Sequence, residues 1–290
     1  MIVEVFKSLR PQQWIKNLFI FAPLIFSRSH LNPALVLETA LGFAAFCLIA
    51  SAQYVFNDIH DLAEDRLHPV KSKRPLASGR LKMGPAVLSC ILLAVCGLAV
   101  AAILDREFFI ISAAYLVLQL LYSLWLKHIV ILDVFVLAAG FVIRVVAGGL
   151  LIEVNISSWL LVCTMLLSLF LALGKRRHEI VLLESNAQNH RPVLKEYSTE
   201  LLDQMISVVT ASTLIAYCLY TISEETVAKF GTRNLIFTVP FVLYGIFRYL
   251  YIIHLKAEGG SPESLIIKDT PLLLDLFLWI AAVILIVGSR

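Results

Sequence analysis

Charged side chains are scarce in this sequence. Asp, Glu, Lys and Arg together make up 16% of its 290 residues, whereas 59% are hydrophobic. A mean hydropathy of +0.85 excludes an ordinary soluble domain and places the chain among polytopic membrane proteins. The five cysteines lie singly in apolar runs without Cys-x-x-Cys or Cys/His spacing, which excludes a zinc site or disulfide framework. The length leaves no room for a second domain, so a single domain over residues 1–290 is expected.

The apolar runs predict an all-α polytopic membrane protein with nine transmembrane helices. The amino terminus lacks the hydrophobic core and cleavage site of a signal peptide, so the first helix is expected to be retained. The expected spans are about 14–26, 35–56, 85–104, 108–126, 129–152, 159–174, 202–222, 235–255 and 271–287. The first span is short and contains Pro23, which makes it the weakest of the nine.

The distribution of positive charge predicts the orientation of the nine helices. With the amino terminus inside, 17 of the 24 Lys and Arg residues fall on the cytoplasmic side, five on the other side and two within spans. Cytoplasmic loops are the ones that carry excess Lys and Arg, so this asymmetry supports the predicted helix count and orientation. It places every polar motif on the cytoplasmic face, and a phosphorylated substrate from the cytosol is expected.

The longest polar interruption runs from Asn57 to Arg80 and reads NDIHDLAEDRLHPVKSKRPLASGR. On a continuous helix, Asp58, Asp61 and Asp65 would lie within an arc of roughly 60°. Three carboxylates so close together repel one another unless a cation is bound, and oxygen ligands favour a hard ion, Mg²⁺ before Zn²⁺. Such an ion usually completes its shell with substrate phosphate oxygens. The cations that follow could hold phosphate directly: Lys71, Lys73, Arg74 and Arg80. A solvated loop of mixed charges is the alternative interpretation.

Two further polar features interrupt the apolar spans. The fifth span carries Asp133 and Arg144, which must face a polar cavity or a partner, so a functional role and a structural ion pair both stay open. After the sixth span the sequence turns polar at GKRRHE, Gly174 to Glu179. For each basic residue, a charge that merely fixes topology is the alternative to substrate binding.

The order of these motifs resembles the UbiA superfamily of intramembrane prenyltransferases. Asn57, Asp58, Asp61 and Asp65 spell NDxxDxxxD, which looks like the first aspartate-rich motif of that superfamily. The resemblance covers the whole chain and implies a UbiA-like helical bundle. The second motif departs from the family pattern, because Lys175, Arg176 and Glu179 stand where a second set of aspartates is usual. A cationic cluster there suits a substrate with more phosphate charge than one diphosphate.

Five stretches also resemble one subgroup, the decaprenyl-phosphate phosphoribosyltransferases. These are LRPQQWIKN (Leu9 to Asn17), the NDIHDLAEDRLHPVKSKRPLASG stretch, IRVVAGG (Ile143 to Gly149), GKRRHE and SPESLIIKD (Ser261 to Asp269). The resemblance implies transfer of phosphoribose from 5-phosphoribosyl 1-diphosphate to a polyprenyl phosphate, with release of diphosphate. It also implies a multi-pass protein of the bacterial inner (plasma) membrane with a cytoplasmic active site and a product that supplies arabinose for cell wall biosynthesis.

The expected roles follow from this chemistry. Asp58, Asp61 and Asp65 would hold Mg²⁺ against the leaving diphosphate, and Asn57 would orient a ligand or bond a phosphate oxygen. The lipid phosphate is already anionic, so no catalytic His is expected, and His60, His68 and His178 are interpreted as surface or supporting residues. The expected substrate-binding residues are Lys73, Arg74, Lys175 and Arg176 first, then Arg10, Lys16, Asn17, Arg144 and Glu179.

The expected partners are the two substrates and the lipid bilayer. No nucleic acid is expected, and a homo-oligomer is left open. Aromatic faces around Tyr115, Tyr122 and Trp125 could line a groove for the polyprenyl tail, although aromatic residues at helical spacing more often pack or form interface belts. Three other functions stay open: a prenyltransferase of the same fold acting on an aromatic or quinone precursor, a polytopic transporter, and a catalytically inactive lipid-binding scaffold, against which the complete NDxxDxxxD motif counts. The sequence shows no clear internal repeat, which counts against the transporter.

Overall fold

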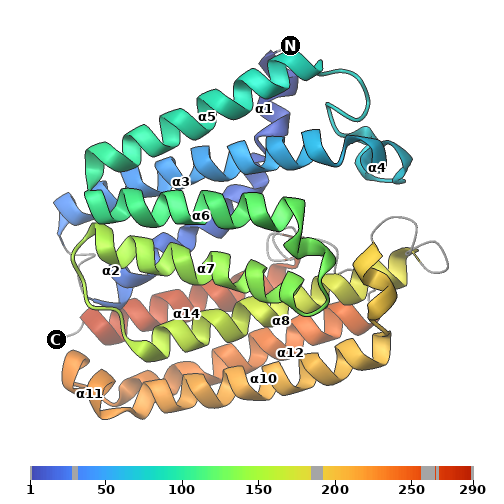
Figure 1. The fold of residues 1–290 in the computed structure, drawn as a ribbon. Helices are drawn as coiled ribbons and strands as arrows, with labels where there is room; N and C mark the ends of the chain where they lie inside the picture. Colours follow the sequence, from blue (N-terminus) through green and yellow to red (C-terminus); the bar gives the residue numbers. More distant parts are fainter. Residues whose placement is uncertain (1, 28–31, 184–191, 256–264, 266–267, 289–290) are drawn as a thin grey trace. The chain divides into compact units, whose positions relative to one another are not determined.

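The computed structural model describes residues 2–27, 32–183, 192–255, 265 and 268–288. These residues form helices and short connections, with no strand within the described ranges. Figure 1 shows the chain coloured from the amino terminus in blue to the carboxyl terminus in red. The chain divides into two compact units, one built mainly from residues 1–155 and the other from residues 156–187 and 194–290. Each unit is described by itself.

The first unit contains seven α-helices and three 3₁₀ segments. They are α1 (Ile2–Ser8), η1 (Pro11–Phe21), α2 (Ala22–Phe26), α3 (Pro33–His60), α4 (Leu62–Leu67), η3 (Lys71–Lys73), α5 (Met83–Leu104), α6 (Arg106–Leu124), η4 (Leu126–His128) and α7 (Leu132–Leu151). The second unit contains α8 (Ser158–Leu183), α10 (Thr199–Ile222), α11 (Glu224–Phe230), η7 (Asn234–Thr238), α12 (Val239–Leu255) and α14 (Thr270–Gly288). Between α8 and α10 lies η6 (Pro192–Glu196).

Eight helical segments within the described residues are long and apolar enough to cross a membrane. They correspond to the second through ninth predicted spans, so the all-α membrane fold is confirmed. The first predicted span differs: residues 11–26 form the 3₁₀ segment η1 and the short helix α2, with Pro23 at the start of α2. This segment lacks the length of the other eight, and the nine-span count is therefore close but not reproduced within the described residues.

Small residues let the segments of the first unit approach closely. A Cβ on Gly148 of α7 would lie 2.1 Å from the carbonyl oxygen of Ile20 in η1, so only glycine fits there. The core of this unit also contains Phe46, Phe108 and Tyr115, whose rings are 5.2–5.7 Å apart between centroids, with Phe46 in the middle. The contact of Gly148 with Ile20 fixes the end of η1 against α7, whereas Arg10 lies just before the start of η1.

Capping side chains set several helix starts. The Asp105 carboxylate accepts a hydrogen bond of 2.7 Å from the Phe108 backbone at the start of α6, and Ser198 caps α10 through the Leu201 backbone at 3.1 Å. In the second unit, Trp279 of α14 donates its indole N–H to the Tyr217 hydroxyl of α10 at 2.9 Å. That hydroxyl also lies 2.7 Å from Thr238 Oγ1, so α10, η7 and α14 share one buried polar contact.

Two predicted boundaries need correction. The sixth span does not end near Gly174, because α8 continues to Leu183 and carries the GKRRHE motif on its last turns. The helix through the first motif is also interrupted. Helix α3 ends at His60, Asp61 is the C-cap residue of α3, and α4 starts at Leu62. The prediction that Asp58, Asp61 and Asp65 share one face assumed an unbroken helix, and the break at Asp61 makes that assumption wrong.

Candidate functional site

The first polar motif forms a cluster in which carboxylates and guanidinium groups alternate. Arg74 Nη1 donates to Asp58 Oδ1 at 3.0 Å and to Asp65 Oδ2 at 2.5 Å. Arg10 Nη2 donates to the same Asp58 oxygen. Asp58 and Asp65 are both nearly inaccessible, with 3% and 2% exposure. Two buried carboxylates are therefore neutralised by two arginines that come from different parts of the chain.

Asp61 faces a second cation, Lys127 of η4. Lys127 Nζ lies 2.5 Å from Asp61 Oδ1, and Lys127 is itself buried, with 6% exposure. The other carboxylate oxygen accepts a hydrogen bond of 3.0 Å from Asn57 Nδ2, and Asn57 Oδ1 accepts one of 3.1 Å from the Ser123 hydroxyl. Asn57 thus orients the Asp61 carboxylate, and its role in orienting a metal ligand stays a prediction. The break in the helix turns Asp61 toward η4, while Asp58 and Asp65 share Arg74.

The backbone around Arg10 is held in an unusual conformation. Arg10 has φ 52° and ψ 63°, in the left-handed region that a non-glycine residue rarely adopts. The neighbouring Leu9 carbonyl accepts a hydrogen bond of 3.0 Å from the Ser51 hydroxyl, which in turn accepts one of 3.0 Å from the Trp14 indole N–H. These contacts to α3 hold the turn that aims the Arg10 guanidinium at Asp58.

The pKa values of the two carboxylates beyond the end of α3 are shifted in opposite directions. Burial alone would raise the pKa of Asp61, but hydrogen bonds from Lys127 and His60 outweigh burial and lower that pKa below its usual value. Burial raises the pKa of Asp65, and the charges of Arg74 and Lys71 offset this only in part. Asp65 therefore takes up a proton before Asp61 does as the pH falls.

The donor set fits a hard divalent cation at Asp58 and Asp65. A single nitrogen of Arg74 is within hydrogen-bonding distance of an oxygen from each carboxylate, so both oxygens already converge on one positive centre. Mg²⁺ is commonly bound by one or two carboxylates together with substrate phosphates. As the side chains stand, the described part of the chain brings no three His, Cys, Asp or Glu side chains together for a metal ion. Asp61 as a third ligand stays a prediction.

Arg144 occupies a separate buried site within the first unit. Its three guanidinium nitrogens donate to the Asn17 side-chain oxygen at 2.8 Å, the Gly140 carbonyl at 2.8 Å and the Tyr115 hydroxyl at 2.7 Å. The guanidinium carbon also lies 4.8 Å from the centre of the Tyr115 ring. Arg144 thus connects η1, α6 and α7 through neutral acceptors. Tyr115 and Tyr122 are buried, so these two rings do not form the open lipid groove suggested for them.

The second motif lies on α8 in the second unit. Arg176 is almost inaccessible, with 1% exposure, and Arg176 Nη1 lies 2.6 Å from Glu179 Oε2. Lys175 is half-buried beside it. Arg177, which the sequence did not single out, pairs with Asp203 of α10 at 2.6 Å. Most residues of the SPESLIIKD stretch lie outside the described ones. Asp269 is described, and its two carboxylate oxygens accept hydrogen bonds from Arg248 Nε at 3.0 Å and Nη2 at 2.9 Å.

The structure thus sorts the predicted residues into groups. Asn57 and Asp61 join Lys127, whereas Asp58 and Asp65 join Arg10 and Arg74. Asn17 and Arg144 belong to the separate buried site between η1, α6 and α7. Lys73 is exposed and Lys16 is half-buried. Lys127 is the main residue that sequence reasoning missed, because it was counted only as one positive loop charge. Its position next to the predicted fifth span, between two apolar segments, was the available signal.

Comparison with known proteins places the chain in a family. The model of the UbiA prenyltransferase family matches residues 18–279. The decaprenyl-phosphate phosphoribosyltransferase of Mycolicibacterium smegmatis is 31% identical, over 98% of this chain and 92% of that protein. Its counterpart from Mycobacterium tuberculosis is 30% identical, over 98% of this chain and 94% of that protein.

Solved structures support the fold. A UbiA homologue from Archaeoglobus fulgidus bound to GPP and Mg²⁺ superposes with a TM-score of 0.74 at 20% identity, covering 98% of this chain and 99% of that chain. The family match spans most of the sequence, and the relatives are transferases similar over nearly its whole length. The chain therefore belongs to the UbiA prenyltransferase family and is a multi-pass membrane transferase.

Proposed function

We propose that this chain transfers 5-phosphoribose from 5-phosphoribosyl 1-diphosphate to a polyprenyl phosphate such as decaprenyl phosphate, releasing diphosphate. The observation that carries the proposal is the similarity, over nearly the whole chain, to proteins named decaprenyl-phosphate phosphoribosyltransferase. The basic second motif supports it, because a donor with both a diphosphate and a 5-phosphate needs more cationic partners than a prenyl diphosphate does.

In the proposed reaction, an oxygen of the lipid phosphate attacks the anomeric carbon of the donor. A new carbon–oxygen bond forms as the bond to the diphosphate breaks, and the diphosphate leaves with the electron pair. The nucleophile is already an anion, so no residue needs to remove a proton from it. Mg²⁺ held by Asp58 and Asp65, with Asp61 as the further predicted ligand, would neutralise charge on the departing diphosphate.

The chain's own cations supply the rest of the charge compensation. Arg10 and Arg74 are held at the carboxylates of the first motif, where each can turn a guanidinium N–H toward a phosphate oxygen. In the second motif, Lys175 is the better candidate for the ribose 5-phosphate or the lipid phosphate, since Arg176 is buried against Glu179. Lys73, exposed on η3, is a further phosphate ligand in this proposal.

We further propose that both units act as one intramembrane catalytic domain in the bacterial plasma membrane, with the polar motifs on the cytoplasmic face. The excess of Lys and Arg in the loops after the second and sixth predicted spans supports this orientation. In this arrangement the water-soluble donor arrives from the cytosol and the lipid acceptor from the bilayer.

A lipid-extraction assay tests the proposal directly. Purified protein is incubated with Mg²⁺, polyprenyl phosphate and phosphoribosyl diphosphate labelled in the ribose, and label in the organic phase is counted. A parallel reaction contains labelled prenyl diphosphate and an aromatic acid. Organic-phase label from ribose is the expected result, and label only in the parallel reaction would replace the proposal with a prenyltransferase function.

Variants of the first motif sharpen the assay. Asp58→Asn is expected to lower the rate at least about 100-fold, because it removes a preorganised charge from the leaving-group site. Glu64→Gln, an exposed carboxylate on α4, is the matched control and should keep normal activity. Equal activity of the Asp58 variant and the control would remove this cluster from the reaction.

A further inference from the structure

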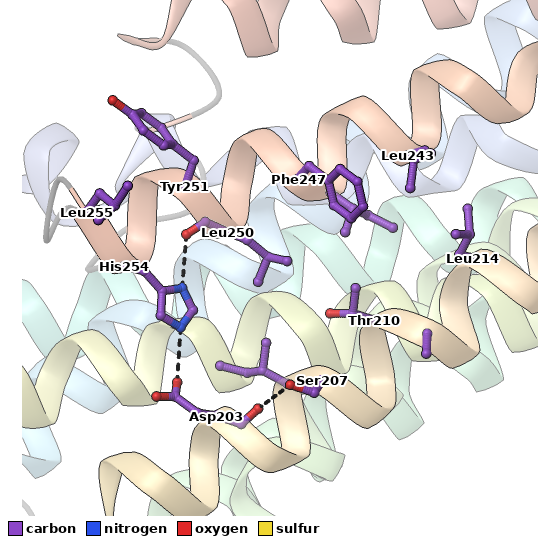
Figure 2. A pocket seen from close by; sticks show the side chains of 13 residues that line it. Asp203, Ser207, Thr210, Leu214, Leu243, Phe247, Leu250, Tyr251, His254 and Leu255 are labelled. Atoms are coloured by element: carbon purple, nitrogen blue, oxygen red, sulfur yellow. Dashed lines mark hydrogen bonds and ion pairs between the residues drawn. The ribbon is translucent and has the colours of Figure 1, made fainter.

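A groove outside the polar clusters runs between two membrane-spanning helices of the second unit. It has a volume of about 680 Å³, and its lining residues among those that the structure describes come from α10 and α12 (Figure 2). That volume is in the range of small-molecule sites. Most of the lining side chains are aliphatic or aromatic, including Leu214, Leu243, Phe247 and Leu250. Such a lining excludes a hydrophilic ligand and favours a hydrocarbon chain.

One end of the groove is polar. Figure 2 shows the His254 imidazole between the Leu250 carbonyl and the Asp203 carboxylate. His254 Nε2 lies 3.2 Å from Asp203 Oδ1, and Arg177 donates to both oxygens of that carboxylate at 2.6 and 3.3 Å. The Asp203 and His254 side chains remain open at 39% and 36% exposure. A carboxylate offers about four acceptor positions, so one remains for a further donor.

The length of the groove matches one leaflet of a bilayer. Along α10 it extends from Asp203 to Leu214, which corresponds to about 16 Å at ~1.5 Å per residue. The hydrocarbon core of a bilayer is about 30 Å thick, so this is about half of it. Asp203 lies in the first turns of α10 and His254 at the end of α12, so both sit at the same end of the two helices. An amphiphile with its head at Asp203 would place its chain along the groove.

We propose that this groove binds one acyl chain of a zwitterionic phospholipid whose head group carries a primary ammonium. The ammonium donates to the remaining acceptor position of the Asp203 carboxylate, and the phosphate accepts a hydrogen bond from Arg177, whose two terminal nitrogens each carry a second N–H. The positive ammonium then faces the negative Asp203, and the negative phosphate faces the positive Arg177 next to it. A purely anionic head group has no donor cation for Asp203, and a decaprenyl chain is longer than a groove of one leaflet.

This lipid site is distinct from the proposed catalytic machinery. None of Asp203, His254 and the groove side chains is assigned a role in phosphoribosyl transfer, so the site holds a resident lipid and not the acceptor substrate. The proposal stands whether the enzyme transfers phosphoribose or a prenyl group. Binding is therefore measured directly, without an activity readout.

Native mass spectrometry of the purified, delipidated full-length protein tests the site. The protein is titrated in parallel with phosphatidylethanolamine, its trimethylated counterpart phosphatidylcholine, phosphatidylglycerol and decaprenyl phosphate. Phosphatidylethanolamine is expected to give one tightly bound adduct with an affinity about tenfold higher than the other lipids, because only it donates ammonium hydrogen bonds to Asp203. Equal affinity for the first two lipids, or a preference for either anionic lipid, would overturn the head-group assignment.

Two variants locate the binding. Ala211→Phe fills the groove from α10 while leaving the Asp203 cluster in place, and it should lower the affinity for phosphatidylethanolamine about tenfold. Val208→Phe adds the same ring to an exposed position of α10 outside the groove lining and should bind as the natural protein does. Unchanged binding by the Ala211 variant would overturn the proposal. A dimer of the natural protein that persists in the Val208 variant but is lost in the Ala211 variant would also overturn it, because a second copy of the chain would then occupy the groove.

Asp203→Asn tests the head-group contact separately. This variant should lose the discrimination between phosphatidylethanolamine and phosphatidylcholine while keeping the chain-dependent part of the affinity. If the Asp203 variant instead unfolds because Arg177 loses its partner, comparison of the Ala211 and Val208 variants still shows whether the lipid binds in the groove. Retained discrimination in a folded Asp203 variant would show that the ammonium binds elsewhere and would overturn the assignment.

Discussion

One nitrogen of Arg74 joins Asp58 and Asp65, with distances of 3.0 and 2.5 Å to the two carboxylates. The Arg74 guanidinium therefore occupies the position that a divalent cation bound to both carboxylates would take. A metal ion and Arg74 cannot neutralise the same two oxygens at once. Metal binding is expected to release Arg74 from one or both carboxylates.

Arg74→Ala tests this exchange. Loss of the guanidinium leaves two buried carboxylates with less compensation, which should cost about 1–3 kcal/mol of stability in buffer without divalent ions. Added Mg²⁺ should then raise the thermal midpoint of the variant more than that of the natural protein, as measured by differential scanning fluorimetry. Arg66→Ala, an exposed arginine on α4, is the control. An equal response to Mg²⁺ in both variants would argue against a shared position.

Lys127→Ala is expected to damage activity through Asp61. Without the ammonium, the half-buried Asp61 carboxylate keeps its contacts with Asn57 and His60. We expect kcat/KM to fall at least about 100-fold, since a preorganised charge at the reacting diphosphate is lost. Lys82→Ala, at an exposed position before α5, should behave as the natural protein does. Normal kinetics of the Lys127 variant would assign its ion pair to folding alone.

Tyr115→Phe separates a structural role of Arg144 from a substrate-binding role. The hydroxyl accepts a 2.7 Å hydrogen bond from the buried guanidinium, and its loss should cost about 1.5–3 kcal/mol. The thermal midpoint should fall while the KM for phosphoribosyl diphosphate stays unchanged. A raised KM with an unchanged midpoint would instead bring Arg144 into the substrate site.

The opposite pKa shifts of Asp61 and Asp65 predict opposite pH effects on stability. The lowered pKa of Asp61 means that its contribution is present above the unfolded value of about 3.9 and is lost as the pH falls through the folded pKa. The midpoint difference between the natural protein and Asp61→Asn should therefore stay constant from pH 7 to about pH 4 and shrink below it.

Asp65 should show the reverse trend. Its raised pKa means that the protonated form is favoured by folding, so its stabilising contribution is present at low pH and is lost as the pH rises through the folded pKa. As the pH falls from 7, the natural protein should gain stability relative to Asp65→Asn, starting above about pH 4. Parallel pH curves for the two variants would contradict the assignment of both environments.

Most of the fold could be predicted from the sequence, because apolar spans have a length fixed by the bilayer and polar loops interrupt them. Eight spans appear where hydropathy placed them, with ends that differ by a few residues at most except in α8. The continuation of α8 through GKRRHE could not be predicted, since a polar end of a helix and a polar loop have the same composition. The 3₁₀ conformation of residues 11–21 was also hidden, because it depends on packing against α3 and α7, which are distant in the sequence.

The site was predictable in composition and less so in arrangement. Asp58, Asp65 and Arg74 were selected from sequence, and they do meet. The turn of Asp61 toward Lys127 depends on a helix break at one residue and on a contact between positions 66 residues apart, which no local pattern encodes. The left-handed conformation of Arg10 depends in the same way on its contacts with α3.

The fit of Gly148 against the Ile20 carbonyl also bears on how the chain enters the membrane. Residues 11–26 leave the ribosome long before α7, yet they pack against α7 and contain no helix long enough to cross a bilayer alone. We expect this segment to wait at the membrane surface, or to insert loosely, until α7 has been synthesised. The hydrogen bond from Arg144 to Asn17 would then form late, and nascent chains truncated before residue 144 would lack it.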